Sequence, residues 1–150
     1  MFEFLKRGKK AERPFVSAII AAGGHSVRMG SENKLLLELG TMPVLVHTLT
    51  AFEACPDIDE IVLVAKGDSV VEYTNLAADA GITKLRHVVA GGDTRLESVY
   101  QGLGFISDEA RLVAVHDGAR PCHPPEDNAR EVAEYTVAYT HIALAPTTIE

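Results

Sequence analysis

Short apolar runs alternate along this sequence with segments whose apolar residues recur at helical spacing. The run VSAIIA at residues 16–21 is continuously apolar and leads to glycines, which suits a buried strand feeding a loop. Similar runs predict further strands at 60–65, 84–90, 112–116 and 141–145. The intervening segments predict helices at 43–54, 69–80, 94–106 and 126–139.

The predicted helices carry typical boundary residues. Pro43 is compatible with a first helical position, and Gly81 is a usual residue for a helix stop. In the helix at 94–106 the apolar residues fall along one side, namely Leu96, Val99, Leu103 and Ile106. This spacing is typical of an amphipathic helix that packs by its apolar side.

The order of these elements indicates the fold class. Strands that alternate with helices at this spacing favour parallel pairing and right-handed crossovers. We therefore predict an α/β fold, a Rossmann-like, mostly parallel sheet with helices on both faces. Ligands bind such sheets beyond the carboxyl ends of the strands, where three predicted loops lie at 22–34, 91–95 and 117–121.

Composition narrows the prediction to one globular domain. The chain has 150 residues, of which 47% are hydrophobic, and this is enough for one compact core. We predict a flexible leader at 1–14 and a domain at 15–150. No apolar run approaches the roughly 20 residues that span a bilayer, so we expect a cytoplasmic protein without a membrane partner.

Charge argues against one large class of partners. The formal net charge is -7, and clustered basic residues occur only in the leader, which disfavours nucleic-acid binding. Binding of a small anionic ligand by a few cations is compatible with this charge. Cys55 and Cys122 are isolated from each other and from any metal-binding spacing, so we expect inert thiols.

The first loop has the composition of a phosphate-binding turn. It reads AAGGHSVRMG from residue 21 and is followed by Lys34. Glycines let the backbone approach a phosphate, while Arg28 and Lys34 can neutralise a triphosphate and the charge that builds on it during reaction. The loop matches neither the Walker pattern nor the GxGxxG pattern. It predicts binding of a nucleoside triphosphate.

The second and third loops each carry a carboxylate near a strand end. The second reads GGDTR at 91–95, with Ser98 one turn into the following helix. These groups suit the recognition of a base and ribose, although Asp93 would equally serve as a helix cap. In the third loop Asp117 suits Mg²⁺, which prefers oxygen ligands and bridges phosphates. The alternative role for Asp117 is that of an ordinary turn residue before Gly118.

Taken together, the three motifs resemble one family. The first loop resembles the signature of nucleotidyltransferases that act on sugar and alcohol phosphates. GGDTRLESV and VHDGARP follow it, and the ordered set resembles the 2-C-methyl-D-erythritol 4-phosphate cytidylyltransferase family over about residues 17–121. The resemblance implies a fold of the nucleotide-diphospho-sugar transferase type. It also implies Mg²⁺-dependent transfer of CMP from CTP to methylerythritol phosphate, with release of pyrophosphate.

The resemblance assigns a role to each motif. The first loop would hold the triphosphate of CTP, and its two cations would stabilise the transition state. The second loop would recognise cytidine, and the third would hold the metal. The residues carried over are Ala22, Gly23, Gly24, Arg28 and Lys34 for the triphosphate, Gly92, Asp93 and Ser98 for cytidine, Asp117 for Mg²⁺, and Gly118 beside the nucleotide.

Several alternatives stay open at this point. The first loop also resembles that of molybdenum-cofactor guanylyltransferase, whereas the later motifs favour cytidylyl transfer. Ribitol-5-phosphate cytidylyltransferase resembles the chain in all three motifs, and a catalytically impaired nucleotide-binding module is a further alternative. Members of the family continue past the position of Glu150 through a dimer-forming arm and a further aspartate and lysine. We therefore read the chain as truncated, with a homodimer implied by the family alone, and we expect weak or absent activity if this is the whole chain.

Overall fold

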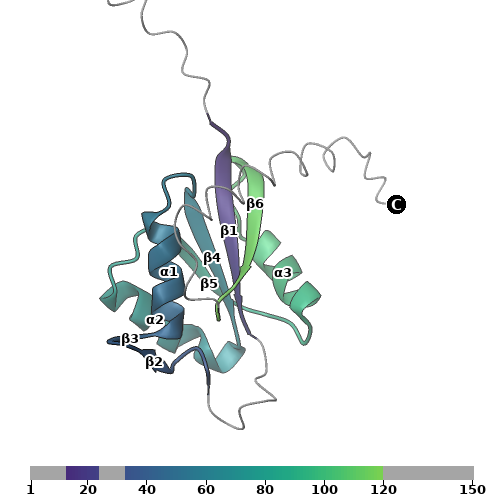
Figure 1. The fold of residues 1–150 in the computed structure, drawn as a ribbon. Coiled ribbons are helices and arrows are strands. Elements are labelled where there is room, and N and C mark those ends of the chain that lie inside the picture. The colour runs from purple at the N-terminus through teal and green to yellow at the C-terminus, as the bar shows by residue number, and fades with distance from the viewer. Residues whose placement is uncertain (1–12, 24–32, 120–150) are drawn as a thin grey trace, which may run out of the picture.

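The computed structural model of the protein describes residues 13–23 and 33–119 (Figure 1). The predicted helix at 126–139 and strand at 141–145 lie outside these residues. In chain order the elements are β1 (Phe15–Ala22), β2 (Glu38–Leu39), β3 (Met42–Pro43), α1 (Val44–Ala54), β4 (Glu60–Ala65), the 3-10 helix η1 (Gly67–Ser69), α2 (Val70–Asp79), β5 (Leu85–Ala90), α3 (Arg95–Leu103) and β6 (Ala110–Asp117).

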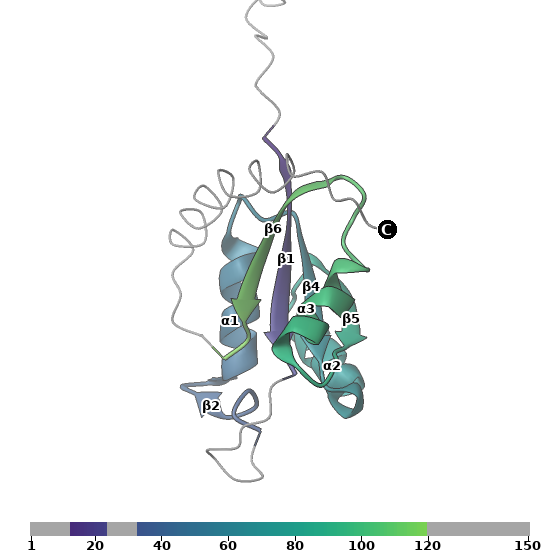
Figure 2. The ribbon, with the colours of Figure 1, turned by 90° about the vertical axis from the view of Figure 1, so that its right-hand side faces the viewer.

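Four of these strands form one parallel sheet in the order β5-β4-β1-β6. The central strand β1 lies between β4 and β6 (Figures 1 and 2). After β1 the chain adds β4 and β5 on one side, then returns to place β6 on the other. The prediction of parallel pairing is confirmed. Because the direction of strand addition reverses between β1 and β6, their carboxyl ends form the place where open α/β sheets bind ligands.

Side chains that alternate along the strands divide the core into two layers. Helices α1 and α2 cover one face of the sheet and α3 covers the other, which confirms the predicted helices on both faces (Figure 1). On the first face, Ile20 packs in a cluster with Phe52 and Tyr73. On the second face, Ile19 packs with Val64 beneath α3.

The side of α3 that faces the sheet differs from the predicted one. Its buried residues are Ser98 and Gly102, whereas Leu96 and Leu103 are 79% and 42% exposed. A Cβ added at Gly102 would lie 2.9 Å from a methyl group of Ile19, so the helix and the sheet are in close contact. Branched side chains of the sheet already fill this layer, and only small residues of α3 fit against them. The prediction of a contact side that includes these two leucines was therefore wrong.

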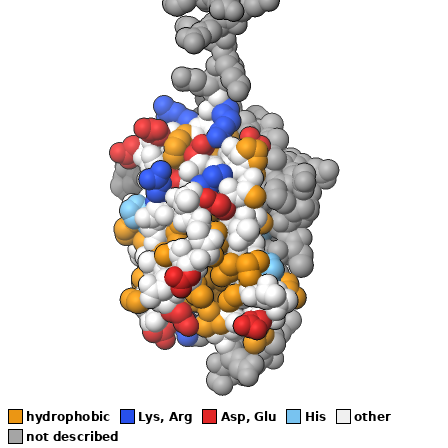
Figure 3. Space-filling model, turned by 90° about the vertical axis from the view of Figure 1, so that its left-hand side faces the viewer, with side chains coloured by type: hydrophobic (Ala, Val, Ile, Leu, Met, Phe, Trp, Pro, Cys, Tyr) orange, Lys and Arg blue, Asp and Glu red, His pale blue; other side chains and the backbone are white. Residues whose placement is uncertain are grey.

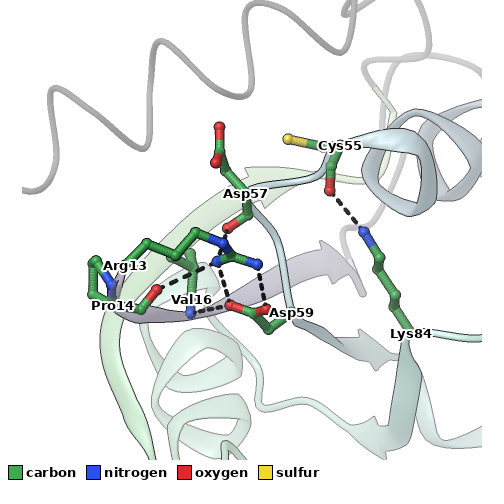
Figure 4. Close-up of polar contacts among 7 residues, drawn as sticks. All are labelled: Arg13, Pro14, Val16, Cys55, Asp57, Asp59 and Lys84. Atoms are coloured by element: carbon green, nitrogen blue, oxygen red, sulfur yellow. Dashed lines mark hydrogen bonds and ion pairs between the residues drawn. The ribbon is translucent and has the colours of Figure 1, made fainter. Parts of the chain in front are cut away.

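A polar cluster fastens the amino end of β1 (Figure 4). Arg13 donates hydrogen bonds of 2.8 and 2.6 Å to the two carboxylate oxygens of Asp59, and the backbone N–H of Val16 donates to the same carboxylate at 2.9 Å. Lys84 donates to the carbonyl oxygen of Cys55 at 2.7 Å beside this cluster. Burial raises the pKa of Asp59, but the bonds from Arg13 and Val16 outweigh burial and lower that pKa below its ordinary value.

The outer face on the side of α1 and α2 carries side chains of both charges. In Figure 3, Lys and Arg lie among Asp and Glu toward one end, and hydrophobic side chains are scattered over the rest. The described residues on this face therefore form no continuous basic stripe. Within residues 13–23 and 33–119, every helix is too short or too polar to cross a membrane.

Candidate functional site

A cavity of about 360 Å³ lies at the carboxyl ends of β1 and β6, beside the start of α3. It forms where the direction of strand addition reverses, because parallel pairing places Ala21 in register with Asp117. All three predicted loops contribute to its wall. The lining residues are Ala21, Ala22, Gly23, Lys34, Leu35, Gly92, Asp93, Thr94, Arg95, Ser98, Asp117 and Ala119.

Ala22, the last residue of β1, and Gly23, which follows it, contribute to the cavity wall. A Cβ added at Gly23 would lie no closer than 3.6 Å to the backbone of Ala65, which is ordinary van der Waals contact. The packing of the described residues therefore does not itself require glycine at this position. Gly24 and Arg28 lie outside the described residues, and their roles stay predictions.

Lys34 reaches the cavity because the residues on either side of it are fixed. The side-chain amide of Asn33 donates to the hydroxyl of Tyr73 on α2 at 2.7 Å. The Leu35 side chain is buried in the core, and its carbonyl accepts from the N–H of Leu45 at 3.0 Å. The exposed Lys34 side chain stands between these two anchors and lines the cavity.

The second loop meets the start of α3 through a capping box. Thr94 is the N-cap residue, and its hydroxyl accepts from the N–H of Glu97 at 3.1 Å. The Glu97 carboxylate accepts in return from the N–H groups of Thr94 and Asp93, at 3.0 and 2.8 Å. These bonds satisfy amides at the helix start. The alternative in which Asp93 caps this helix was therefore wrong, and the exposed Asp93 carboxylate stands in the cavity wall outside the cap.

Close packing against α3 explains the two glycines of the second loop. A Cβ added at Gly91 would overlap the Ser98 side chain, and one at Gly92 would overlap the Glu97 side chain. Ser98 is buried, and its hydroxyl donates to the carbonyl of Gly92 at 3.4 Å. The loop and the first turn of α3 therefore present one continuous surface to the cavity.

The third loop begins at Asp117, the last residue of β6. The Nε group of Arg95 donates to its carboxylate at 3.1 Å, so the ion pair joins the second loop region to the third. Gly118 is buried behind the cavity wall, between Asp117 and Ala119, and its N–H donates to the carbonyl of Ala21 at 2.8 Å. Hydrogen bonds therefore connect all three loops around the cavity.

Sequence reasoning missed Arg95 as a site residue, although it lies within the quoted motif GGDTR. The available signal was a cation directly after a helix cap, on a loop at the carboxyl ends of the strands. With Lys34 it gives the described wall two cations, beside the two carboxylates of Asp93 and Asp117 in the same lining. Both cations can contact phosphate oxygens, and both carboxylates can contact a metal ion or hydroxyl groups.

The described residues contain no group of three His, Cys, Asp or Glu side chains that could hold a metal ion without help from a ligand. Mg²⁺ commonly takes one or two protein carboxylates and completes its shell with phosphate oxygens and water. The carboxylate of Asp117 lies in the cavity wall, and its side chain is 42% exposed. It therefore fits a metal that is bound together with a phosphorylated ligand.

Comparison with known proteins assigns the chain to a family. The model of the family described as 2-C-methyl-D-erythritol 4-phosphate cytidylyltransferase matches residues 16–148. A protein of that name from Clostridium tetani is 44% identical over 105 residues, which cover 69% of this chain and 42% of that protein. Another from Pelotomaculum thermopropionicum is 38% identical over 132 residues, covering 87% of this chain and 55% of that protein.

A solved structure supports the same assignment. The crystal structure of 4-diphosphocytidyl-2C-methyl-D-erythritol synthase from Anaerococcus prevotii matches with a TM-score of 0.69 and 31% identity, covering 81% of this chain and 50% of that chain. The chain spans about half the length of the curated relatives it matches. The nucleotidyltransferase type of α/β fold is thereby confirmed. The chain belongs to the 2-C-methyl-D-erythritol 4-phosphate cytidylyltransferase family.

Proposed function

We propose that the protein binds CTP in this cavity and transfers its cytidylyl group to 2-C-methyl-D-erythritol 4-phosphate. The observation that carries the proposal is the convergence of three separate loops on one cavity of about 360 Å³. That volume is within the ordinary range of small-molecule sites. The names of the two curated relatives support this acceptor over ribitol 5-phosphate.

The triphosphate would lie along the first loop. Lys34 lies between two residues that are already held in place. Contact with a phosphate therefore costs the conformational entropy of the Lys34 side chain but little further entropy of the backbone around it. The backbone at Ala22 and Gly23 faces the same space and has room for a close approach. We infer that Gly24 and Arg28 complete this part of the site.

The cytidine would lie against the start of α3. Gly92 and Asp93 form the exposed edge of the wall, and Ser98 reaches it from the first turn of the helix. Carboxylate, hydroxyl and backbone groups at fixed positions can distinguish one base from another, because a wrong base leaves polar groups unpaired. The capping box keeps this edge in place before the ligand arrives.

Asp117 would hold Mg²⁺ together with the phosphates of CTP. The metal, when bound, supplies positive charge that stabilises the oxygens of the reacting phosphate. Arg95 donates to the same carboxylate, so it orients Asp117 and adds a second positive charge at this end of the cavity. Within the part of the chain that the structure describes, the Asp117 carboxylate pairs with Arg95 and its side chain is 42% exposed, which leaves it accessible to a ligand.

The reaction proposed is a displacement at phosphorus. A phosphate oxygen of the acceptor attacks the α-phosphorus of CTP and forms the new phosphorus–oxygen bond. The bond from the α-phosphorus to the bridging oxygen breaks, and pyrophosphate leaves with that electron pair. Lys34 and Arg28 would stabilise the added negative charge in the transition state, so no covalent intermediate with the protein is required.

Titration and turnover together test this proposal. Calorimetric titration with CTP and with GTP, each with Mg²⁺, should give binding of CTP that is at least about tenfold tighter, a difference of about 1.4 kcal/mol. Pyrophosphate release should then depend on methylerythritol phosphate, with ribitol 5-phosphate as the matched alternative acceptor. Equal binding of both nucleotides would refute the assigned base recognition. CTP binding without pyrophosphate release would favour the catalytically impaired module.

A further inference from the structure

A threonine outside all three motifs contacts the wall of the cavity from behind. Thr48 lies in the middle of α1 and is 1% exposed. Its hydroxyl oxygen is 2.8 Å from the carbonyl oxygen of Gly118 and 3.3 Å from that of Val44 in its own helix. A hydroxyl group has a single hydrogen, so the shorter bond to Gly118 is the principal one.

A second helical threonine shows what this side chain does without such a partner. Thr74 on α2 is exposed, and its hydroxyl donates at 2.7 Å to the carbonyl of Val70, four residues earlier in the same helix. That local bond is usual for threonine in a helix. In Thr48 the hydroxyl instead joins two segments that are 70 residues apart in sequence. The bond therefore fixes tertiary structure.

The bond from Thr48 completes the fixation of Gly118. The N–H of Gly118 donates to the carbonyl of Ala21 on β1 at 2.8 Å, and its carbonyl accepts from Thr48. A Cβ added at Gly118 would lie 3.3 Å from the carbonyl oxygen of Ala21, so the peptide has little room to move. The residues before and after it, Asp117 and Ala119, both line the cavity.

We propose that Thr48 is a positioning residue of the nucleotide site. Its hydroxyl holds the peptide between Gly118 and Ala119, and thereby keeps the Asp117 carboxylate in the geometry that binds the metal-bound nucleotide. This inference rests on the function proposed above. Thr48 touches neither ligand nor metal, and it acts through Gly118.

The size of the effect follows from one buried hydrogen bond. Thr48→Val keeps the side-chain shape and leaves the Gly118 carbonyl without this donor. A hydrogen bond contributes about 0.5–1.5 kcal/mol net to folding stability, and affinity would fall by roughly 2- to 12-fold if this whole contribution were needed only to hold the binding-competent geometry. We therefore expect Thr48→Val to weaken CTP·Mg²⁺ binding by about 3- to 10-fold. Thr48→Ser, which keeps the hydroxyl, should restore most of this loss.

The experiment measures CTP·Mg²⁺ affinity and amide hydrogen exchange of the full chain, well below the unfolding transition. The variants are Thr48→Val and Thr48→Ser, with Thr74→Val as the matched control for the same substitution in a helix. Thr48→Val should weaken affinity and speed exchange of the segment 113–119, while exchange in β4 stays unchanged. Thr74→Val should match the wild type in both measurements.

Each other outcome has a defined meaning. If the wild type binds CTP and Thr48→Val binds equally well, the inference is wrong while the proposed function stands. If Thr48→Ser is as weak as Thr48→Val, or if exchange rises throughout the sheet, the role is general packing and the inference is again wrong. If the wild type binds no CTP, the proposed function fails and this inference fails with it.

Discussion

The close contact between α3 and the sheet leads to a prediction about the stability of Gly102→Ala. Helix propensity alone predicts a more stable protein, whereas tertiary packing predicts a less stable one. Alanine is the better helix former, so Gly102→Ala considered locally should stabilise α3 by up to about 1 kcal/mol. In the folded protein the added Cβ would lie 2.9 Å from methyl groups of both Ile19 and Val64. Both side chains are 0% exposed, so neither can turn away into solvent.

Overpacking of this kind costs about 1–3 kcal/mol, because the helix or the strands must move apart. Because the added Cβ would meet two fully buried side chains, we take the upper part of this range, about 2–3 kcal/mol. After subtraction of a propensity gain of about 1 kcal/mol, we expect Gly102→Ala to lower the free energy of unfolding by about 1–2 kcal/mol. In a domain of this size each kcal/mol lowers Tm by about 2–4 °C. Ser98 lies one helical turn earlier on the same side of α3 and lines the cavity, so CTP binding should weaken as well.

Urea unfolding and calorimetry of the variant provide the measurement. Gly67→Ala is the matched control, because a Cβ at Gly67 meets nothing within 4 Å and its backbone is outside the left-handed region. That control should stay within about 0.5 kcal/mol of the wild type. A Gly102→Ala variant as stable as the wild type, or more stable, would refute the packing argument for α3.

Three further predictions concern the site and the amino end of the sheet. Lys34→Ala should weaken CTP binding by at least about tenfold, as expected for a lost charge-assisted hydrogen bond. Arg111→Ala, which removes a cation at the opposite end of the sheet, should leave the affinity unchanged in the same calorimetric titration. Equal losses in both variants would show that only the general charge of the protein matters. Asp117→Asn should abolish the Mg²⁺ dependence of CTP binding, and a dependence that persists would exclude Asp117 as the metal ligand. The pKa of Asp59 is lower in the folded state than in the unfolded state. The ionised carboxylate therefore stabilises the fold at any pH above the unfolded pKa of about 3.9, and this stabilisation is lost as the pH falls through the folded pKa. Urea unfolding between about pH 6 and pH 3 should therefore show a smaller loss of stability on acidification in Asp59→Asn than in the wild type, and parallel curves would contradict this assignment.

The apolar pattern of the sequence determined most of the fold. The strand predicted at 60–65 matches β4 (Glu60–Ala65). A strand that is buried on both faces is a nearly continuous apolar run, so it can be identified in the sequence without knowing which strands lie beside it. The helix boundaries predicted from helical spacing were also close, although Pro43 precedes α1 as its N-cap residue. The short hairpin of β2 and β3 was not predicted, because two-residue strands leave no periodicity to detect.

The sequence also predicted which loops line the cavity. Glycines and charged residues at strand ends pointed to Lys34, Asp93 and Asp117, and the structure places all three in one cavity wall. The strand order that brings them together depends on pairing between β1 and β6, which lie far apart in the chain.

Contacts between distant elements were decided by tertiary structure alone. Gly102 and Ser98 replace the leucines as the contact side of α3, because the room available beside Ile19 is a property of the packed layer and is not encoded in the helix pattern. The pairing of Arg95 with Asp117 and the bond from Thr48 to Gly118 likewise join residues that no local spacing relates. Periodicity reports which residues an element buries on average, whereas the partner that each side chain meets is set only when the layers pack.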